Sequence, residues 1–407
     1  MTELSPPGPR AAFRLIRDRN FGPYFFGNAS SASGTWFQNL AASLLVYRLT
    51  HSAFLLGVLN FCNFIPVLLL APWAGSAADR FERRRLLLVT QLGSTAVSAG
   101  LAALAWAGLA RVWVVIACAL VLGVGSAFAA PASQALIGDL VAREQLGSAV
   151  ALNSMTYNLA RAVGPALAAV SVRALGIPAS FAINAGSYLV LVFGLLVIRP
   201  APRRLALPGE ARMRESLRLV RDQPRLLAFL LIVTAVGFAS DPVNTESPAF
   251  AHAFGRPDTD AGYLIGAFGV GAVLAAFLVA GRVSGSRGRM LLTLGLLGGG
   301  MIAYSLVPWL SLGYVFLGVA GFGYLASNTA ATTRLQLGVE AHQWGRIMAL
   351  WSVAFLGLRP IASLTDGAIA AAFGVRTAGV TLAVPVLAIA GAIYFLQRHH
   401  RTLTPRV

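Results

Sequence analysis

Long apolar runs recur along the whole chain, and only short polar segments separate them. A helix of roughly 20 apolar residues spans a hydrocarbon core about 30 Å thick. We expect such helices at residues 21–46, 53–78, 86–108, 112–133, 147–173, 178–198, 226–250, 260–282, 290–309, 312–334, 346–372 and 377–397. The composition agrees, because only 12% of the residues are charged, against about 25% in soluble domains. The sequence predicts an all-α membrane protein with twelve transmembrane helices.

The arginines lie in alternate segments between the apolar runs, and the sequence contains no lysine. Excess basic residues mark the cytoplasmic loops of membrane proteins. The arginine-rich segments include 10–19, 80–85, 199–225, 282–289 and 398–406. The opposite segments carry single arginines, namely Arg48, Arg111, Arg173, Arg256 and Arg376. We therefore predict a multi-pass protein of the plasma or inner membrane with both termini in the cytoplasm. The net charge of +17 then reflects contact with membrane lipid rather than with nucleic acid.

The longest polar segment divides the predicted spans into two sets of six. The predicted parts are a cytoplasmic N-terminal segment at 1–20, a six-helix bundle at 21–198, a cytoplasmic basic linker at 199–225, a second six-helix bundle at 226–397 and a cytoplasmic tail at 398–407. Within the linker, residues 213–221 are interpreted either as a short amphipathic helix on the inner leaflet or as disordered chain.

Spans five and eleven share a sequence pattern. Ala-Leu-Asn-Ser at 151–154 matches Ala-Leu-Trp-Ser at 349–352. At the same offset three further pairs match, namely Gly147 with Gly345, Tyr157 with Phe355 and Arg161 with Arg359. Because each half has six spans, both halves enter the membrane in the same sense, and we predict an axis of pseudo-symmetry along the membrane normal. Substrate sites in folds of this kind lie near the midplane between the repeats.

The loop between spans two and three, residues 75–85, reads Gly-Ser-Ala-Ala-Asp-Arg-Phe-Glu-Arg-Arg-Arg. It resembles the signature Gly-x-Leu-Ala-Asp-Arg-x-Gly-Arg-Arg of the major facilitator superfamily. The matching residues are Gly75, Ala78, Asp79, Arg80, Arg83 and Arg84, and the departures are Ala77 and Glu82. Residues 45–52, Ile65-Pro66, Asn153-Ser154, Asn158, Arg161 and Gly164-Pro165 resemble its enterobactin-exporter-like branch, which is grouped with drug–proton antiporters. The resemblance implies two pseudo-symmetric six-helix bundles in the major facilitator fold.

The resemblance also implies a gating role for this loop. In the superfamily the aspartate at the position of Asp79 caps a facing helix of the other half and latches the outward-open state. Here that helix would start near Gly345 and Arg346. The following arginines either join this latch or anchor the loop to anionic headgroups. For Arg83 and Arg84 taken singly, anchoring is the expected role.

Charged residues inside the predicted spans are the main candidates for function, since charge is costly in hydrocarbon. At a rise of 1.5 Å per residue, Asp241, Arg359 and Arg161 lie roughly 20 Å from the inner helix ends. Glu246 and Asp366 are expected at the outer mouth, where water is available. Our hypothesis is that Asp241 pairs with Arg359 and binds the coupling proton. The alternatives are a permanent ion pair that fixes helix register and, for Arg161, a hydrogen bond to Gln38 or Thr35.

Polar and aromatic side chains within the spans define a predicted substrate cavity. They are Asn28, Thr35, Gln38, Asn153, Tyr157, Asn244, Asn328, Trp351 and Phe355. Small residues nearby, such as Gly34, are instead expected to let helices pack closely.

These features favour a secondary active transporter, and we expect proton-coupled efflux of a small amphiphilic compound by alternating access. The alternatives are a proton-coupled importer of a polar nutrient and a membrane scaffold or sensor that transports nothing. No nucleotide loop, zinc spacing or nucleophile motif occurs in the sequence, so we predict no enzyme, cofactor or metal site. The expected partners are the substrate, the proton and membrane lipid, and one chain is expected to act as a monomer.

Overall fold

The computed structural model describes residues 14–142, 145–199, 220–221, 223–279, 287–340 and 343–403. Within these ranges every regular element is a helix and no strand occurs. The first helices are α2 (Phe21–Thr50), α3 (Ala53–Arg80), α4 (Arg83–Trp106), α5 (Val112–Leu140), α6 (Leu146–Leu175) and α7 (Ile177–Val197). They are followed by α9 (Pro224–Thr245), α10 (Ser247–Ala253), η2 (Asp258–Asp260), α11 (Ala261–Val279), α12 (Arg287–Leu306), α13 (Leu310–Leu337), α14 (Trp344–Ser352), the π-helix η4 (Val353–Gly357), α15 (Arg359–Phe373) and α16 (Val375–Leu403). The linker helix predicted at 213–221 falls almost entirely outside the described residues.

The helices agree with twelve membrane crossings. Helices α2 to α7 supply six, and α9 with α10, α11, α12, α13, α14 with α15, and α16 supply six more. In the described ranges ten spans are long and apolar enough to cross a membrane by length and composition alone. The two helices that do not meet this criterion are α2 and α6. Within α6, the residues Val163–Leu175 form a shorter apolar stretch. These are the helices that carry the polar residues of the first half, which explains their lower hydropathy.

Two compact units make up the chain. One comprises Met1–Leu45 and Ile65–Gly209, and the other Val46–Phe64 and Glu210–Val407. This division differs from the predicted bundles in one segment, because the end of α2 and the first part of α3 belong to the second unit.

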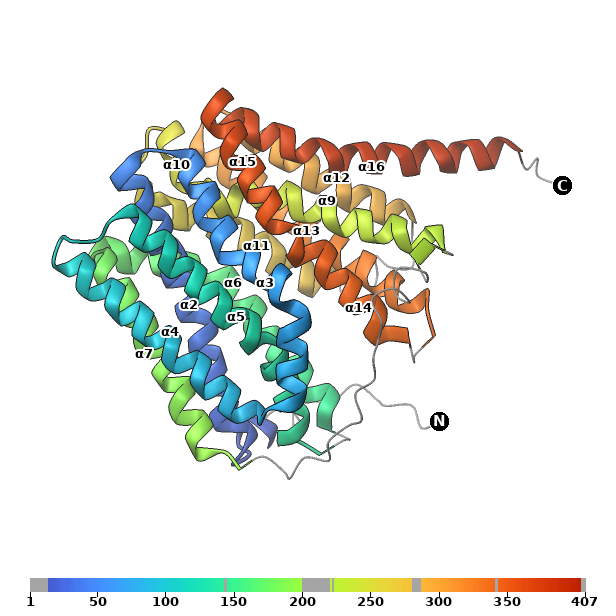
Figure 1. The fold of residues 1–407 in the computed structure, drawn as a ribbon. Helices are drawn as coiled ribbons and strands as arrows, with labels where there is room; N and C mark the ends of the chain where they lie inside the picture. The colour runs from blue at the N-terminus through green and yellow to red at the C-terminus, as the bar shows by residue number, and fades with distance from the viewer. Residues whose placement is uncertain are drawn as a thin grey trace. The chain divides into compact units, whose positions relative to one another are not determined.

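The two units repeat the same helix pairings. In the first, α4 packs against α5 and α7, and α6 packs against α7. In the second, α12 packs against α13 and α16, and α15 packs against α16. Figure 1 shows α4 beside α7 and α12 beside α16. These matched pairings confirm the pseudo-symmetric six-helix bundles.

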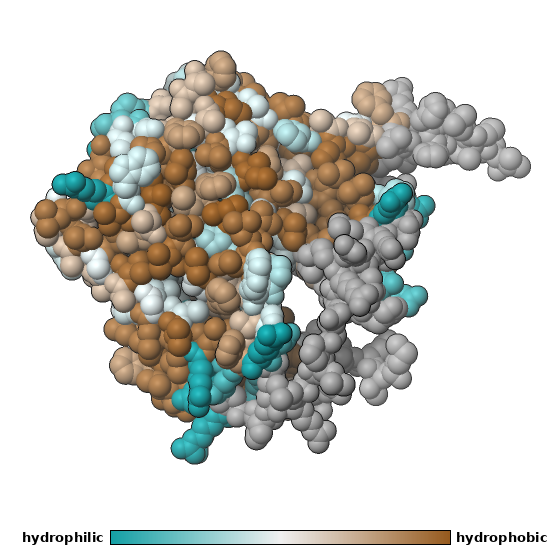
Figure 2. All heavy atoms as spheres, in the orientation of Figure 1, coloured by the Kyte–Doolittle hydropathy of each residue, from teal (hydrophilic) through white to brown (hydrophobic). Residues whose placement is uncertain are grey.

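Large apolar side chains cover the outside of the helices. Trp73 and Phe193 are each 65% exposed, and Phe277 is 75% exposed. Figure 2 shows a face covered mostly by hydrophobic residues, with hydrophilic ones gathered near its edges. A soluble protein rarely exposes so large an apolar surface. This surface therefore suits lipid.

Close contact between α11 and α13 depends on glycine. A Cβ added at Gly321 would collide with the carbonyl oxygen of Phe268, and one at Gly271 would collide with that of Gly318. Backbones in membranes approach this closely where small residues face each other, which maximises van der Waals contact.

We predict that Gly321→Ala lowers the stability of the second unit by about 1–3 kcal/mol, the usual cost of overpacking a filled interface. The thermal unfolding midpoint in detergent measures this loss. Gly295→Ala in the neighbouring α12 is the control, because its Cβ meets nothing within 4 Å. Equal midpoints for the two variants would refute the packing argument.

Candidate functional site

The centre of the candidate site is Asp241 on α9, which is 1% exposed. Its carboxylate accepts hydrogen bonds from Thr245 Oγ1 at 2.9 Å and from Ser363 Oγ at 3.1 Å. Thr245 reaches it because residues four apart share a helix face, and Ser363 comes from α15, which packs against α9. Two hydroxyl donors thus hold a carboxylate in the interior of the second unit.

Arg359, at the start of α15, is the cation whose charge acts on Asp241. Its guanidinium, however, lies over the ring of Phe64, 4.6 Å from the centroid. The side chains of Asp241 and Arg359 form no direct ion pair within the described structure, in contrast to the hypothesis from depth. The reason is local, since the two hydroxyls occupy the carboxylate and the aromatic face occupies the arginine.

Glu246 and Asp366 were predicted to lie at the outer mouth in contact with water, and the structure shows otherwise. Both are fully buried. Glu246 lies between α9 and α10, and Asp366 lies on α15. Depth along the axis was a poor guide here, because neighbouring helices cover both side chains.

Spans seven and eleven are both interrupted beside these residues. Span seven breaks at Glu246, just before Ser247-Pro248, while α9 continues through Pro242. Span eleven contains the π-helix η4, and Thr234 Oγ1 on α9 donates a 3.1 Å hydrogen bond to the carbonyl oxygen of Ala354 within it. A π-bulge frequently marks a functional site.

The predicted cavity residues of the second unit fall into two environments. Trp351 and Phe355 stack with their ring centroids 5.0 Å apart. Trp351 Nε1 and Asn328 Oδ1 are buried and have no hydrogen-bond partner among the described residues. Asn244 instead donates to the backbone oxygen of Ser240 at 2.8 Å.

In the first unit, Asn28 Nδ2 donates to Asn153 Oδ1 at 2.7 Å and joins α2 to α6. Gln38 is buried and accepts from Asn184 Nδ2 at 2.9 Å, so it points into the bundle toward α7 rather than into a cavity. Thr35 bonds back to the oxygen of Ser31. Tyr157 is 56% exposed and Arg161 is half-buried, both on α6.

The residues of the signature loop lie at the junction of α3 and α4. Asp79 and Arg80 are exposed in the last turn of α3, and a Cβ at Gly75 would meet nothing within 4 Å. The turn passes through Glu82, whose φ is −62°. A glycine is therefore not required there, and the departure from the signature costs no strain.

Arg83 and Arg84 are more than membrane anchors. Arg83 Nη1 donates to both carboxylate oxygens of Asp139 on α5 at 2.8 Å and to the oxygen of Ala135. Arg84 donates to the carbonyl oxygens of Leu195 and Leu196 at the end of α7, where a cation stabilises a helix terminus. Asp139 was missed from the sequence, because nothing local indicates that it faces Arg83.

We predict that the Arg83–Asp139 bond contributes about 1.5–3 kcal/mol, the range for hydrogen bonds to charged groups. A double-mutant cycle of Arg83→Ala and Asp139→Ala, read by thermal unfolding, measures this coupling. The exposed Arg85–Glu82 pair is the control and should show about 0–1 kcal/mol. A value for Arg83–Asp139 no larger than the control would contradict the assignment.

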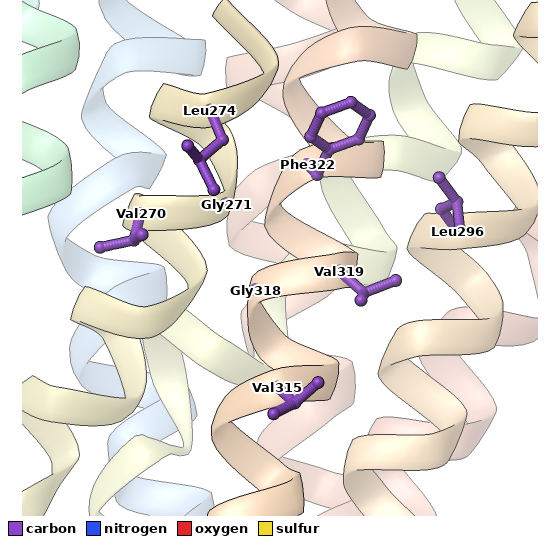
Figure 3. Close-up of a pocket in the computed structure, with 8 residues that line it drawn as sticks. All are labelled: Val270, Gly271, Leu274, Leu296, Val315, Gly318, Val319 and Phe322. Carbon is purple, nitrogen blue, oxygen red and sulfur yellow. The ribbon is translucent and has the colours of Figure 1, made fainter. Parts of the chain in front are cut away.

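A separate apolar pocket of about 340 Å³ lies among α11, α12 and α13. Figure 3 shows its lining, namely Val270, Gly271, Leu274, Leu296, Val315, Gly318, Val319 and Phe322. Val270, Leu274 and Val315 are at least half exposed. The pocket therefore opens on the apolar outer surface and offers no group for proton chemistry.

The chain matches a known protein family over nearly its whole length. The family, described as transmembrane secretion effector and part of the major facilitator superfamily, matches residues 11–402. The chain belongs to this family. Major facilitator proteins of this family are transporters embedded in a membrane, not enzymes.

Curated relatives of this major facilitator transporter cover most of its length. The staphyloferrin A transporter of Staphylococcus aureus is 26% identical over 393 residues, which span 92% of this chain and 96% of the relative. The multidrug efflux pump Tap of Mycolicibacterium fortuitum is 24% identical, with 92% and 94% covered. The enterobactin exporter EntS of Escherichia coli is 25% identical, with 90% of each chain covered.

Solved structures share the major facilitator fold. A D-xylose–proton symporter superimposes with a TM-score of 0.74 at 15% identity, covering 92% of this chain and 97% of that one. A bacterial homologue of the lysosomal transporter Spinster, inward-facing and occupied, gives 0.73 at 17% identity, covering 97% and 98%. At these identities the likeness concerns the fold alone.

Proposed function

We propose that this transporter exports a small amphiphilic compound in exchange for protons, by alternating access. The observation that carries the proposal is the buried, hydroxyl-bonded Asp241, set beside Arg359 in a membrane-embedded unit. Relatives that are named as exporters or efflux pumps support the direction of transport.

Asp241 suits proton coupling because burying its ionised form costs much more free energy than burying its protonated form. An ionised carboxylate inside a membrane protein needs nearby donors or a cation. Thr245, Ser363 and the charge of Arg359 provide that support. A shift of α15 relative to α9 would remove the Ser363 hydroxyl and move Arg359, and the carboxylate would then take up a proton. Proton binding and helix movement are thereby linked.

The interrupted spans give this movement a place to occur. The π-helix η4 and the break at Glu246 lie on the two helices that hold the site. Trp351 and Phe355 on span eleven, with Asn244 and Asn328, form the proposed substrate wall of the second unit. Asn28, Asn153 and Tyr157 are proposed to form that of the first, with Arg161 among them.

The gate is proposed to lie at the cytoplasmic end, in the segment 75–84. Asp79 acts as the latch, while Arg83 and Arg84 hold the base of α4 against α5 and α7. We place both termini in the cytoplasm of a plasma or inner membrane, with one chain as the working unit.

Everted membrane vesicles from an overexpressing strain test this function. An imposed pH gradient should drive accumulation of ethidium, or of a compound found by drug-susceptibility profiling, well above that in vesicles without the protein. Equal accumulation in both vesicle types over a broad panel would refute export.

A further inference from the structure

Two carboxyl groups near Asp241 take no part in the mechanism above. Glu246 and Asp366 are fully buried, and none of their four carboxylate oxygens has a hydrogen-bond partner among the described residues. Asp241 differs, because hydroxyl groups bind both of its oxygens. Glu246 and Asp366 are thus acidic groups that lack the support an ionised carboxylate requires.

The charged and titratable groups around the pair are mostly acidic. Asp241 acts electrostatically on both carboxyls, and Glu246 also acts on Asp366. Tyr47, at the end of α2, feels the charge of Glu246 and of Asp258. Arg359 acts on Asp241 and lies over Phe64. Other groups on adjoining elements include Arg48, which binds Asp258 at 2.5 Å, and His252, whose ring lies 6.3 Å from that of Tyr47. Arg376 on α16 donates to the carbonyl oxygen of Ala253 at the end of α10, and Arg256 binds Asp260 at 2.9 Å.

The charge of Arg359 therefore offsets that of Asp241, while the charges that act on Glu246 and Asp366 are those of acidic groups. Ionising all three carboxyl groups would bury like charges beside one another, away from the solvent that would stabilise them. Buried carboxyls in this situation keep a proton instead. We propose that Glu246 and Asp366 carry protons in this conformation and form a second proton-binding site beside Asp241.

The ligand class follows from the geometry. Metal binding would require several acidic, histidine or cysteine side chains converging on one point, and no such group of three occurs in the described part of the chain. An organic cation would need an open cavity, whereas both carboxyls have no exposed surface. The proton is the cation that fits.

The proposal deepens the proposed function and rests on proton coupling through Asp241. Glu246 lies at the break between α9 and α10, and it acts electrostatically on Tyr47 of α2, whose ring lies 6.3 Å from that of His252 on α10. The pair is therefore placed to pass protons between the region of Tyr47 and His252 and Asp241. More than one proton can then be bound in a transport cycle.

Infrared difference spectroscopy of the full-length protein in lipid tests the proposal without any substrate. A protonated buried carboxyl gives a carbonyl band that ionised carboxylates and amides lack. We expect such bands at neutral pH, and they should disappear on strong alkalinisation. Glu246→Gln and Asp366→Asn should each remove part of the signal, and the double variant should remove both parts. Glu82→Gln, at an exposed position, should leave the spectrum unchanged.

The wild-type spectrum keeps the test informative even where a variant fails to fold. Absence of any protonated-carboxyl band at neutral pH would overturn the proposal, as would bands that persist unchanged in the folded double variant. The result is separable from the proposed function, since Asp241→Asn should leave the Glu246 and Asp366 bands in place. If Asp241→Asn leaves transport intact, the coupling role of Asp241 is refuted. The carbonyl bands of Glu246 and Asp366 still show whether these two groups bind protons.

Discussion

Asp241→Asn is expected to abolish ethidium accumulation driven by a pH gradient in everted vesicles. Asparagine keeps the shape of the side chain, and its Oδ1 can still accept from one of the two hydroxyls while its Nδ2 donates to the other, but it cannot exchange a proton. If the free energy that couples proton binding to transport falls by about 1.4 kcal/mol, the corresponding equilibrium changes by a factor of about ten. We therefore expect accumulation driven by the pH gradient to fall at least tenfold. The variant should fold, because neutralising a buried carboxylate removes a desolvation cost.

Two comparisons make this prediction specific. Arg111→Gln, at an exposed position between α4 and α5, should transport like the wild type. Downhill movement of ethidium in the absence of a pH gradient should survive in Asp241→Asn, since the path itself is intact. Wild-type accumulation by Asp241→Asn would mean that the carboxylate only fixes helix register.

Arg359→Gln should impair transport as severely as Asp241→Asn, and it should also destabilise the protein. Removing the arginine takes away the cation whose charge acts on the buried Asp241 carboxylate, and an uncompensated buried charge destabilises a fold. Thermal unfolding in detergent, together with vesicle transport, measures both effects.

The double variant Asp241→Asn/Arg359→Gln distinguishes charge from shape. Removing both charges should recover most of the stability lost in Arg359→Gln, while pH-driven transport stays absent. Additive losses of stability in the double variant would show that Arg359 acts through its contact with Phe64 and not through Asp241.

Much of the architecture was accessible from the sequence, because each apolar run must cross lipid and each arginine-rich loop must avoid it. The twelve spans and the two-fold repeat follow from these one-dimensional patterns. The sequence also singled out Asp241, because an acidic residue deep in an apolar run has few structural uses.

Lateral arrangement was not accessible in the same way. Depth along a helix axis placed Asp241 level with Arg359, but hydroxyls from Thr245 and Ser363 occupy the carboxylate instead. The same depth argument put Glu246 and Asp366 near water, whereas neighbouring helices cover them. Rotation about the helix axis and the choice of neighbour arise from packing between distant segments, as they do for Arg83 and Asp139.

Proton movement in liposomes containing the purified protein tests the central claim most directly. Ethidium is trapped inside together with a pH-sensitive dye, and an outward ethidium gradient is imposed without a pH gradient. Exchange predicts that protons enter as ethidium leaves, so the interior should acidify with the wild type and stay constant with Asp241→Asn. Alkalinisation of the interior would indicate symport, and no change with the wild type while ethidium leaves would contradict proton coupling altogether.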